Sequence, residues 1–484
     1  MKHFRSPHAA RRAIKARLCL AAVVACTGAG LAQAGIVTDP GGMALANCPL
    51  AAFQYVCVVE GRARVDGITA APIEKVRISR TAGYHNGATL TVGADAVLTL
   101  NSVASVVDNQ ADLVVGDNVG AAGTLAVVDG GKIEINVPVT TSGGLFIGVF
   151  AAPLDAPAGL GGSPLPSTRA FISGGGMVTV NKGGGPFAGS AVGVGVATGS
   201  HSSLVLDGGI GNFGSPALGA TLTTTGNLSI GREGSGAVSL VRNANLSAHT
   251  TYLSVVSASG VSTLDVGFQS TLSGEVVAGI GRNPVTLLPD PTVAEHGRAV
   301  IDVRTAGAIL GQVTLGQGGT LRGSGFVAGL VNHGGVVAPG NSPGTLTIGA
   351  GGYVDNGGDL HIEFGGSGQD RLVVEGPVAL NGTAIEFSFI EGFAPAAGTS
   401  FEFLSAGNAA PTLTGVQYSY TGLEPGFEFE VSTGGDGRLV FTALTNGVSV
   451  VPEPAAWWLA AFGLGLLYLV PKMRSPASPR PGTM

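Results

Sequence analysis

Short runs of valine, leucine, isoleucine and threonine, each closed by a glycine turn, recur along this chain. The clearest unit, residues 113–135, alternates apolar and polar positions through three runs that glycine-rich turns separate. The pattern returns at residues 228–246, with weaker copies between residues 145 and 303. Alternation with a period of two predicts half-buried strands, and no stretch between Gly35 and Val450 shows a sustained helical period. We therefore expect an all-β chain.

The repeats also predict how the strands are arranged. A strand triplet of this length cannot bury its apolar side alone, whereas stacked coils bury one another's inward side chains. Glycine, which makes up 81 of the 484 residues, suits corners that need a positive φ. We predict a parallel β-solenoid, specifically a three-sided right-handed β-helix, over residues 86–334; an array of β-sandwiches is the alternative. Inserts at 151–166 and 283–296 should project from it as loops.

The first 34 residues have the parts of a secretory signal. A cationic start precedes an apolar segment over residues 18–31, and Ala32-Gln33-Ala34 is an A-x-A cleavage site. Residues 23–26 also match a lipobox, which would make Cys26 a lipidated terminus, and Arg11-Arg12 offers a poorer match to a twin-arginine signal. We expect export through the Sec translocon, with residues 1–34 removed.

The other end of the chain carries a segment with three parts. Pro452-Glu453-Pro454 precedes an uncharged apolar run over residues 455–470, and a basic tail over residues 471–484 follows with Lys472 and Arg474. As a helix the run would be about 24 Å long, slightly short of a bilayer core, and the basic residues suit its cytoplasmic side. The residues alone leave three interpretations: a permanent anchor, a buried core helix, or a temporary membrane handle.

This order of Pro-Glu-Pro, apolar span and basic end resembles the PEP-CTERM sorting signal of Gram-negative bacteria, here within residues 447–484. The resemblance implies that an exosortase, a membrane-embedded cysteine transpeptidase, cuts near Pro452, Glu453 and Pro454. It also implies that the inner membrane holds the chain only transiently, before the body is released or attached at the cell surface.

A second resemblance concerns the body. The repeats, together with the Pro-Gly-Asn-Ser-Pro-Gly-Thr-Leu segment at residues 339–346, are similar to those of type V secretion passengers (autotransporters) and of PEP-CTERM proteins. This similarity implies a closing β cap over residues 335–446, whose phenylalanines would plug the open core. An autotransporter itself would end in amphipathic membrane strands, whereas this chain ends in an apolar run and a basic tail.

Removal of both ends leaves an acidic body. Six basic residues precede Ala34 and three follow Pro454, while Glu453 is the one acidic residue in those segments, so the body holds 16 basic and 30 acidic residues. A net charge near −14 argues against nucleic acid as a partner. Cys48 and Cys57 are the two cysteines outside the signal, and we predict that they form a disulfide in an N-terminal cap over residues 35–85. Two free thiols are the alternative.

Catalytic patterns are weak. Glycoside hydrolysis needs two carboxylates that face a sugar, and the candidates are Asp129, Asp207, Asp265 and Asp302. The first two precede Gly-Gly and suit turns, and the other two suit outward positions of strands. Residues 365–373 match one calcium-binding nonapeptide, but such sites form between tandem copies. Both tryptophans lie in the tail, which leaves the body without tryptophan platforms for sugars.

The sequence therefore predicts an exported structural or adhesive protein of the cell surface or extracellular matrix, which is not an enzyme and has no cofactor or metal. The expected partners are the exosortase, the Sec translocon and the inner membrane, with an extracellular polysaccharide as a further candidate. The alternatives are a polysaccharide lyase or hydrolase, and an adhesin for a defined glycan or protein. Carboxylates beside Lys or Arg in a groove would favour the enzyme, and a flat Thr, Ser, Asn and Gly face would count against it.

Overall fold

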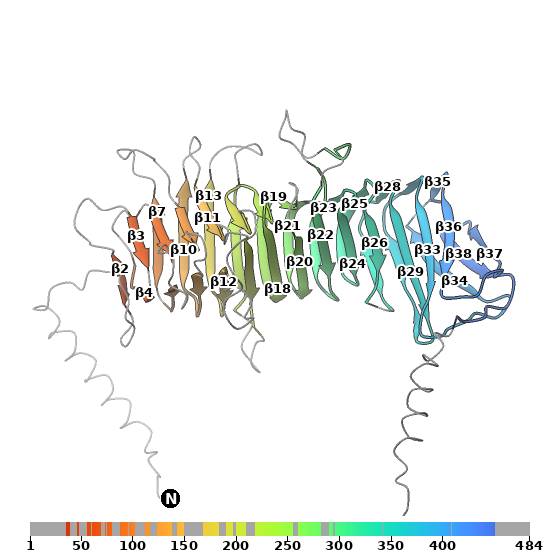
Figure 1. Ribbon diagram of the computed structural model, residues 1–484, viewed down its shortest axis with the longest axis horizontal. Coiled ribbons are helices and arrows are strands. Elements are labelled where there is room, and N and C mark those ends of the chain that lie inside the picture. The colour runs from red at the N-terminus through yellow and green to blue at the C-terminus, as the bar shows by residue number, and fades with distance from the viewer. Residues whose placement is uncertain are drawn as a thin grey trace, which may run out of the picture.

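A computed structural model describes residues 35–38, 46–47, 56–59 and most of 61–450 of the chain. Within the last range, the residues outside the description are 69–72, 74, 80–87, 95, 102–111, 117–122, 138–142, 150–167, 183–189, 197–199, 210–217, 255–259, 282–289, 294–295, 342 and 408. The described part consists of strands β1 to β38 and contains no helix, which confirms the prediction of an all-β chain. These strands follow one another along an elongated body (Figure 1).

Alternating burial explains why these segments form strands. In β10 (Lys132–Val137), Ile133 and Ile135 are buried, whereas Lys132 and Glu134 are exposed. The same alternation recurs in most strands of the body. Because successive side chains of a strand point to opposite faces, each strand turns its aliphatic residues to one side and its polar residues to the other.

One sheet of 15 strands is called the first wall. Its strands, in order, are β1 (Gly35–Thr38), β4 (Arg62–Asp66), β6 (Ala88–Val92), β9 (Gly123–Val127), β12 (Thr168–Ser173), β15 (His201–Asp207), β18 (Ser235–Arg242), β20 (Val261–Phe268), β22 (Arg298–Val303), β24 (Gly319–Gly323), β26 (Val336–Pro339), β29 (Asp359–Gly365), β33 (Ala384–Phe389) and β36 (Gln417–Thr421), with β30 (Gly368–Gln369) beside β29. Neighbours from β4 to β36 pair in parallel, whereas β1 and β30 pair antiparallel.

The other sheet has 23 strands, whose pairings form two rows called the second and third walls. The second wall contains β7 (Val97–Asn101), β10, β13 (Met177–Lys182), β16 (Ala220–Thr224), β27 (Thr345–Ile348), β31 (Arg371–Val374), β34 (Ser400–Ala406), β38 (Arg438–Ala443) and β37 (Phe429–Thr433). The third wall contains β2 (Ala46–Asn47), β3 (Val56–Val59), β5 (Lys75–Ile78), β8 (Asp112–Val115), β11 (Gly144–Ile147), β14 (Val192–Val194), β17 (Leu228–Ile230), β28 (Tyr353–Asn356), β32 (Val378–Asn381) and β35 (Thr412–Thr414).

Four longer strands belong to both rows: β19 (Ala244–Leu253), β21 (Thr271–Ala278), β23 (Ala308–Leu315) and β25 (Phe326–Asn332). The first residues of β19 pair with β16 of the second wall and its last residues pair with β17 of the third wall. A register shift between Ser247 and Thr250 marks the bend in its pairing with β21.

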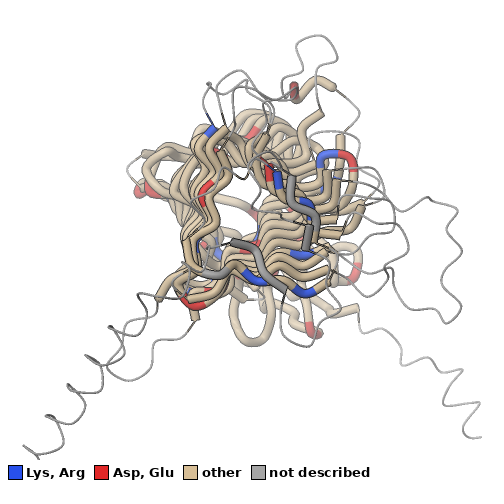
Figure 2. Tube along the Cα trace, turned by 90° about the vertical axis from the view of Figure 1, so that its left-hand side faces the viewer, with Lys and Arg blue, Asp and Glu red and all other residues tan. Residues whose placement is uncertain are grey.

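Each coil of the chain contributes to the three walls in turn. β9, β10 and β11 make one coil, and β12, β13 and β14 make the next, with each strand parallel to its counterpart. Viewed along the long axis, the coils superimpose on one another (Figure 2). Long parallel sheets of this kind are consistent with a parallel β-solenoid, and they do not fit an array of sandwiches built from antiparallel strands.

The core consists of columns of aliphatic side chains that run from coil to coil. In the first wall, Leu90, Leu125, Ala170 and Leu204 occupy one register position on successive coils, and all four are fully buried. Such columns join into one continuous hydrophobic cluster. Full burial of a valine or leucine side chain contributes about 1.5–3 kcal/mol, so stability depends on keeping the register between coils.

Glycine is required where a corner of one coil closely approaches the next coil. Gly144 has a φ of 145°, and a Cβ atom there would collide with the carbonyl oxygen of Ala191 in the following coil. Gly340 has a φ of 92°, and a Cβ atom there would collide with the carboxylate of Asp370. These two positions therefore need glycine both for conformation and for space.

At the C-terminal end, parallel pairing continues past residue 335, where the sequence analysis places the start of the cap, as far as β35 and β36. The hairpin of β37 and β38 then closes the second wall by antiparallel pairing of β38 with β34. Aromatic rings pack together here: Phe364, Phe387, Phe389, Phe393, Phe401, Phe403, Tyr418, Tyr420, Phe427, Phe429 and Phe441. The rings therefore fill this end of the core.

A buried polar network links three coils just before this aromatic region. The carboxylate of Asp355 is fully buried and accepts four hydrogen bonds of 2.6–2.8 Å, from Asn332 Nδ2, Tyr353 Oη, Gly358 N–H and Thr383 Oγ1. No charged group is among these donors, so the carboxylate depends on all four of them.

Replacement of Asp355 by Asn should lower the free energy of unfolding by about 2–4 kcal/mol. The amide would place an NH2 group, which donates, against donors that now point at a carboxylate oxygen. Urea unfolding of the two proteins measures the difference. Asp129→Asn is the matched control, because Asp129 is exposed with a φ of 52°, a conformation that Asn tolerates. Equal stabilities of Asp355→Asn and wild type would contradict the role of the network.

Candidate functional site

Most residues of the predicted sorting and processing sites lie outside the described part of the chain. These residues are Ala32, Ala34, Cys48, Pro452, Glu453, Pro454, Lys472 and Arg474. Cys57 lies in β3, whose backbone pairs in parallel with β5, but its side chain is outside the description. The inserts at 151–166 and most of 283–296, and the glycine run at 183–185, are likewise outside it. The cleavage sites, the disulfide and the membrane segment stay predictions.

Within residues 35–450, as far as they are described, no helix has the length and apolar character needed to cross a bilayer. The predicted membrane segment, residues 455–470, lies beyond these residues.

The first two candidate carboxylates lie at turns. Asp129 is exposed in the turn after β9, where the N–H of Gly131 donates to the carbonyl oxygen of Val128 at 2.9 Å. Asp207 ends β15, and its Oδ1 accepts the N–H of Gly209 at 3.0 Å. Both side chains therefore lie in the Asp-Gly turns that the sequence predicts.

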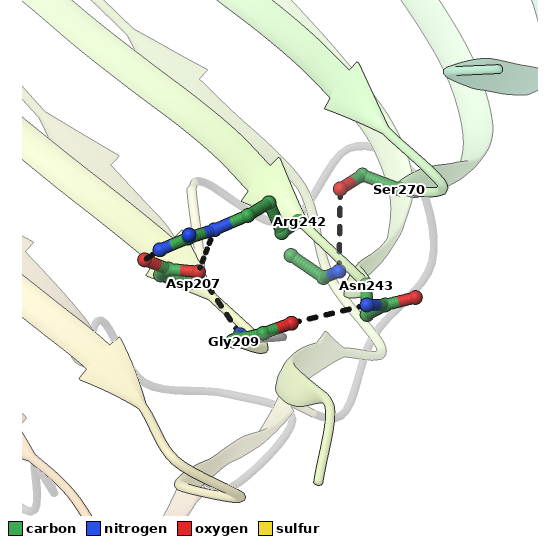
Figure 3. A network of polar contacts seen from close by, with 6 residues as sticks. Asp207, Gly209, Arg242, Asn243 and Ser270 are labelled. Atoms are coloured by element: carbon green, nitrogen blue, oxygen red, sulfur yellow. Dashed lines mark hydrogen bonds and ion pairs between the residues drawn. The ribbon is translucent and has the colours of Figure 1, made fainter. Parts of the chain in front are cut away.

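Asp207 also joins two coils (Figure 3). Arg242, at the end of β18 on the next coil, donates from Nε to Oδ1 at 3.1 Å and from Nη2 to Oδ2 at 2.5 Å. Asn243 donates from Nδ2 to the carbonyl oxygen of Gly209 at 3.1 Å. The hydrogen bonds from Arg242 hold the pKa of Asp207 below its ordinary value. Asp207 is thus an ionised link between turns, already engaged by the protein.

The other two candidate carboxylates lie side by side on the outer face of the first wall. Asp265 in β20 is directly opposite Asp302 in β22, across a strand spacing of about 4.8 Å. Arg304 donates to both oxygens of Asp265, at 2.8 and 2.7 Å. Arg322 Nη2 lies 3.3 Å from Oδ2 of Asp302, whose Oδ1 is buried and has no hydrogen-bond partner in the described part of the chain. Sequence analysis placed each residue on a strand, and the structure pairs the two strands at these positions.

This arrangement limits what the pair can do chemically. Burial raises the pKa of Asp265, while the charge and hydrogen bonds of Arg304 act in the opposite direction. Retaining glycoside hydrolases need two carboxyl groups about 5 Å apart, and each must be free to reach the sugar. Arg304 occupies both oxygens of Asp265, so the pair is better suited to joining coils than to catalysis.

The outer face of the second wall is polar and regular. One register column runs through six successive strands: Thr99, Glu134, Thr179, Thr223, Ser247 and Ser273. A neighbouring column is an asparagine ladder, in which Asn136 donates to Asn101 at 2.7 Å and Asn181 donates to Asn136 at 2.9 Å. The columns form a Thr, Ser and Asn face, the kind that counts against a polysaccharide-acting enzyme.

Residues 365–373, which match a calcium-binding nonapeptide, form a turn and the start of a strand. Gly365 pairs with Gly368 in the β29–β30 hairpin, and β31 follows. Asp370 is only 2% exposed, and its carboxylate accepts the N–H groups of Gly344 at 2.9 Å and Glu363 at 3.2 Å. Asp370 therefore fastens the turn at 340–344 to the hairpin.

One contact that the sequence analysis missed involves a serine and a histidine. His201 begins β15 and Ser235 begins β18, and their Nδ1 and Oγ atoms lie 2.5 Å apart. The residues are 34 positions apart, so only the coil register brings them together. Within the described part of the chain, no carboxylate contacts the His201 ring to complete a catalytic triad.

No group of three or more His, Cys, Asp and Glu side chains in the described residues could hold a metal ion. No protein-family model matches the sequence. No curated protein is significantly similar to it.

The buried Asp370 should give the protein a specific pH dependence. Burial raises the pKa of its carboxyl to about 6, while the hydrogen bonds from Gly344 and Glu363 act in the opposite direction. An unfolded aspartate has a pKa of about 3.9, so between pH 4 and 6 the folded state keeps a proton that the unfolded state has lost. The contribution of Asp370 to the free energy of unfolding should fall by about 2 kcal/mol from pH 4 to pH 7.

Urea unfolding of wild type and Asp370→Asn across this pH range isolates the effect. The stability of wild type relative to the variant should decrease as the pH rises. Asp436→Asn, at an exposed carboxylate, should keep the wild-type pH profile. A wild-type advantage that stays constant from pH 4 to pH 7 would contradict the raised pKa.

Proposed function

We propose that this chain is an exported, non-enzymatic surface protein whose body is a structural or adhesive β-solenoid. In this proposal the body is a right-handed β-helix, with a Cys48–Cys57 disulfide in its N-terminal cap and a β cap over residues 335–446. The Sec translocon exports the chain, the inner membrane holds residues 455–470 transiently, and an exosortase processes the PEP-CTERM tail at Pro452, Glu453 and Pro454. The body then stays at the cell surface or in the extracellular matrix.

The observation that carries the structural role is the use of polar side chains between coils. Arginines pair with carboxylates of the adjacent coil at Asp112, Asp207, Asp265 and Asp302, and asparagines form a ladder on the second wall. Side chains used in this way stabilise a long rod and are not free to act on a substrate. A regular wall of Thr, Ser and Asn also offers many equivalent hydrogen-bonding groups to an extracellular polysaccharide.

Two alternatives compete with this proposal. The neighbouring positions of Asp265 and Asp302 favour a polysaccharide lyase or hydrolase, because Oδ1 of Asp302 has no hydrogen-bond partner among the described residues. An adhesin for a defined glycan or protein would use the inserts at 151–166 and 283–296, since loops on a rigid wall carry binding sites most often. Loss of binding on deletion of these inserts, with folding intact, would favour the adhesin.

The sorting proposal predicts that Glu453→Ala changes where the protein is found in its native host. Wild type should lose its tail and leave the inner membrane, whereas Glu453→Ala should keep the tail and stay in the membrane fraction. Membrane fractionation and the mass of the mature protein measure both outcomes. Glu134→Ala, at an exposed glutamate of the second wall, should behave as wild type. If wild type and Glu453→Ala localise identically and both keep the tail, the sorting hypothesis is wrong.

The non-enzymatic role predicts that the purified protein does not shorten the extracellular polysaccharide of its host. Wild type and Asp302→Asn should release no more reducing ends than a protein-free control. Since lyases leave unsaturated sugars, ultraviolet absorbance should also stay at the control value. Cleavage by wild type that disappears in Asp302→Asn would establish the enzyme alternative and locate its site.

A further inference from the structure

The last four described residues, 447–450, are fastened to the body as a short antiparallel strap. The N–H of Gly447 donates to the carbonyl oxygen of Pro395 at 2.8 Å. The N–H of Glu424 donates to Val448 at 2.8 Å, and the N–H of Val450 donates to Gly422 at 3.2 Å. Between these two bonds, Leu423 and Ser449 form an antiparallel bridge. The folded body therefore extends to Val450.

The strap ends directly before the predicted processing motif. Pro452 follows Val450 by two positions, so it lies within about 7 Å of the strap even when the chain is fully extended. The apolar run then begins at residue 455. Only Val451 separates the strap from the motif in the sequence. An enzyme that binds the motif must therefore also accommodate the folded body beside it.

A closed strap and a bound peptidase compete for the same backbone. Peptide-binding clefts commonly take an extended segment and pair with its N–H and C=O groups. On the strap, the N–H of Val450 and the carbonyl of Val448 already pair with residues 422 and 424. Gly447 is also enclosed, since a Cβ atom there would lie 2.8 Å from Pro395 and 3.2 Å from Leu423. An enzyme therefore cannot engage these residues while the strap is closed.

The strap is weakly held compared with the strand before it. Val448 and Val450 are 54% and 53% exposed, so their side chains lose little burial when the strap detaches, and Leu423 beneath Gly447 is the buried side chain that detachment exposes. In β38, by contrast, Leu439, Phe441 and Ala443 are fully buried. Three backbone hydrogen bonds and the cover over Leu423 hold the strap, so the open strap should be disfavoured by roughly 10²–10³-fold. It can detach while the aromatic core stays folded.

We propose that residues 447–450 form a releasable strap, and that the sorting enzyme processes this chain only when the strap has detached from residues 422–424 and 395. This inference rests on the proposed sorting function and adds its conformational control. Detachment frees residues 447–450 to extend, so that an enzyme acting at the motif can pair with the backbone on its N-terminal side.

A disulfide between residues 423 and 449 tests the proposal. The hydrogen bonds flank this pair and do not join it, so its Cα atoms should lie about 4.5 Å apart, within the range that a disulfide spans. In the native host, Leu423→Cys/Ser449→Cys should be processed at least tenfold more slowly than wild type. Ser449→Cys alone, and the double variant after reduction, should be processed at the wild-type rate.

A linker insertion distinguishes slow processing caused by a closed strap from slow processing caused by a misfolded body. Gly-Ser-Gly-Ser between Val450 and Val451 of the disulfide variant should restore processing, because the motif can then reach the enzyme with the strap closed. Wild-type processing of the oxidised double variant would overturn the proposal. Failure of the linker to restore processing would also overturn the proposal. The closed strap would then not be what keeps the enzyme from the motif.

Hydrogen exchange on the full chain in detergent tests the strap independently of the sorting enzyme. The amides of Glu424 and Val450 should exchange at least tenfold faster than that of Ala443, which donates to Thr399. If the amides of Glu424 and Val450 exchange as slowly as that of Ala443, the strap does not detach on its own and the proposal is wrong, even if the sorting function is established. Unprocessed wild type together with fast exchange would instead refute the sorting function, and with it the proposed role of the strap in processing.

Discussion

In-register parallel pairing between successive coils is the constraint on which the rest of this structure depends. An inward leucine such as Leu125 is buried because Leu90 and Ala170 occupy the same position on the coils before and after it. A slip of one residue would turn every aliphatic side chain of a strand to the outside, so the hydrophobic core and the register stabilise each other. Long inserts at the corners are tolerated because the walls, rather than the corners, carry this register.

The same stacking decides what the outer surface can do. Equivalent outward positions lie about 4.8 Å apart on adjacent coils. An outward side chain therefore has its counterpart on the next coil within contact distance. On the second wall this produces a polar ladder of asparagines, and on the first wall it places Asp265 against Asp302 with Arg304 and Arg322 to balance their charge. Such pairs join coils, which fits an extended structural or adhesive rod better than a catalytic groove.

The C-terminal end combines a strongly held and a weakly held element. Phe364, Phe387 and Phe441 close the open end of the core, where one coil would otherwise leave its apolar side uncovered. Residues 447–450 lie on this closed end through a few hydrogen bonds and half-exposed valines. The body can therefore stay folded while its last residues exchange between a closed and an extended form, directly before the segment that resembles a sorting signal.

The sequence by itself determined the strands, because alternation of apolar and polar residues and the glycine turns are local properties, and it indicated the terminal segments by their order of residue types. It placed Asp207 in its turn and Asp265 and Asp302 on strands. Only the tertiary structure decided which residues meet, such as Asp265 with Arg304 across 39 positions or His201 with Ser235 across 34. The physical reason is that coil length varies, from 16 residues between Thr320 and Val336 to 47 between Leu145 and Val192, so spacing along the chain does not reveal the register.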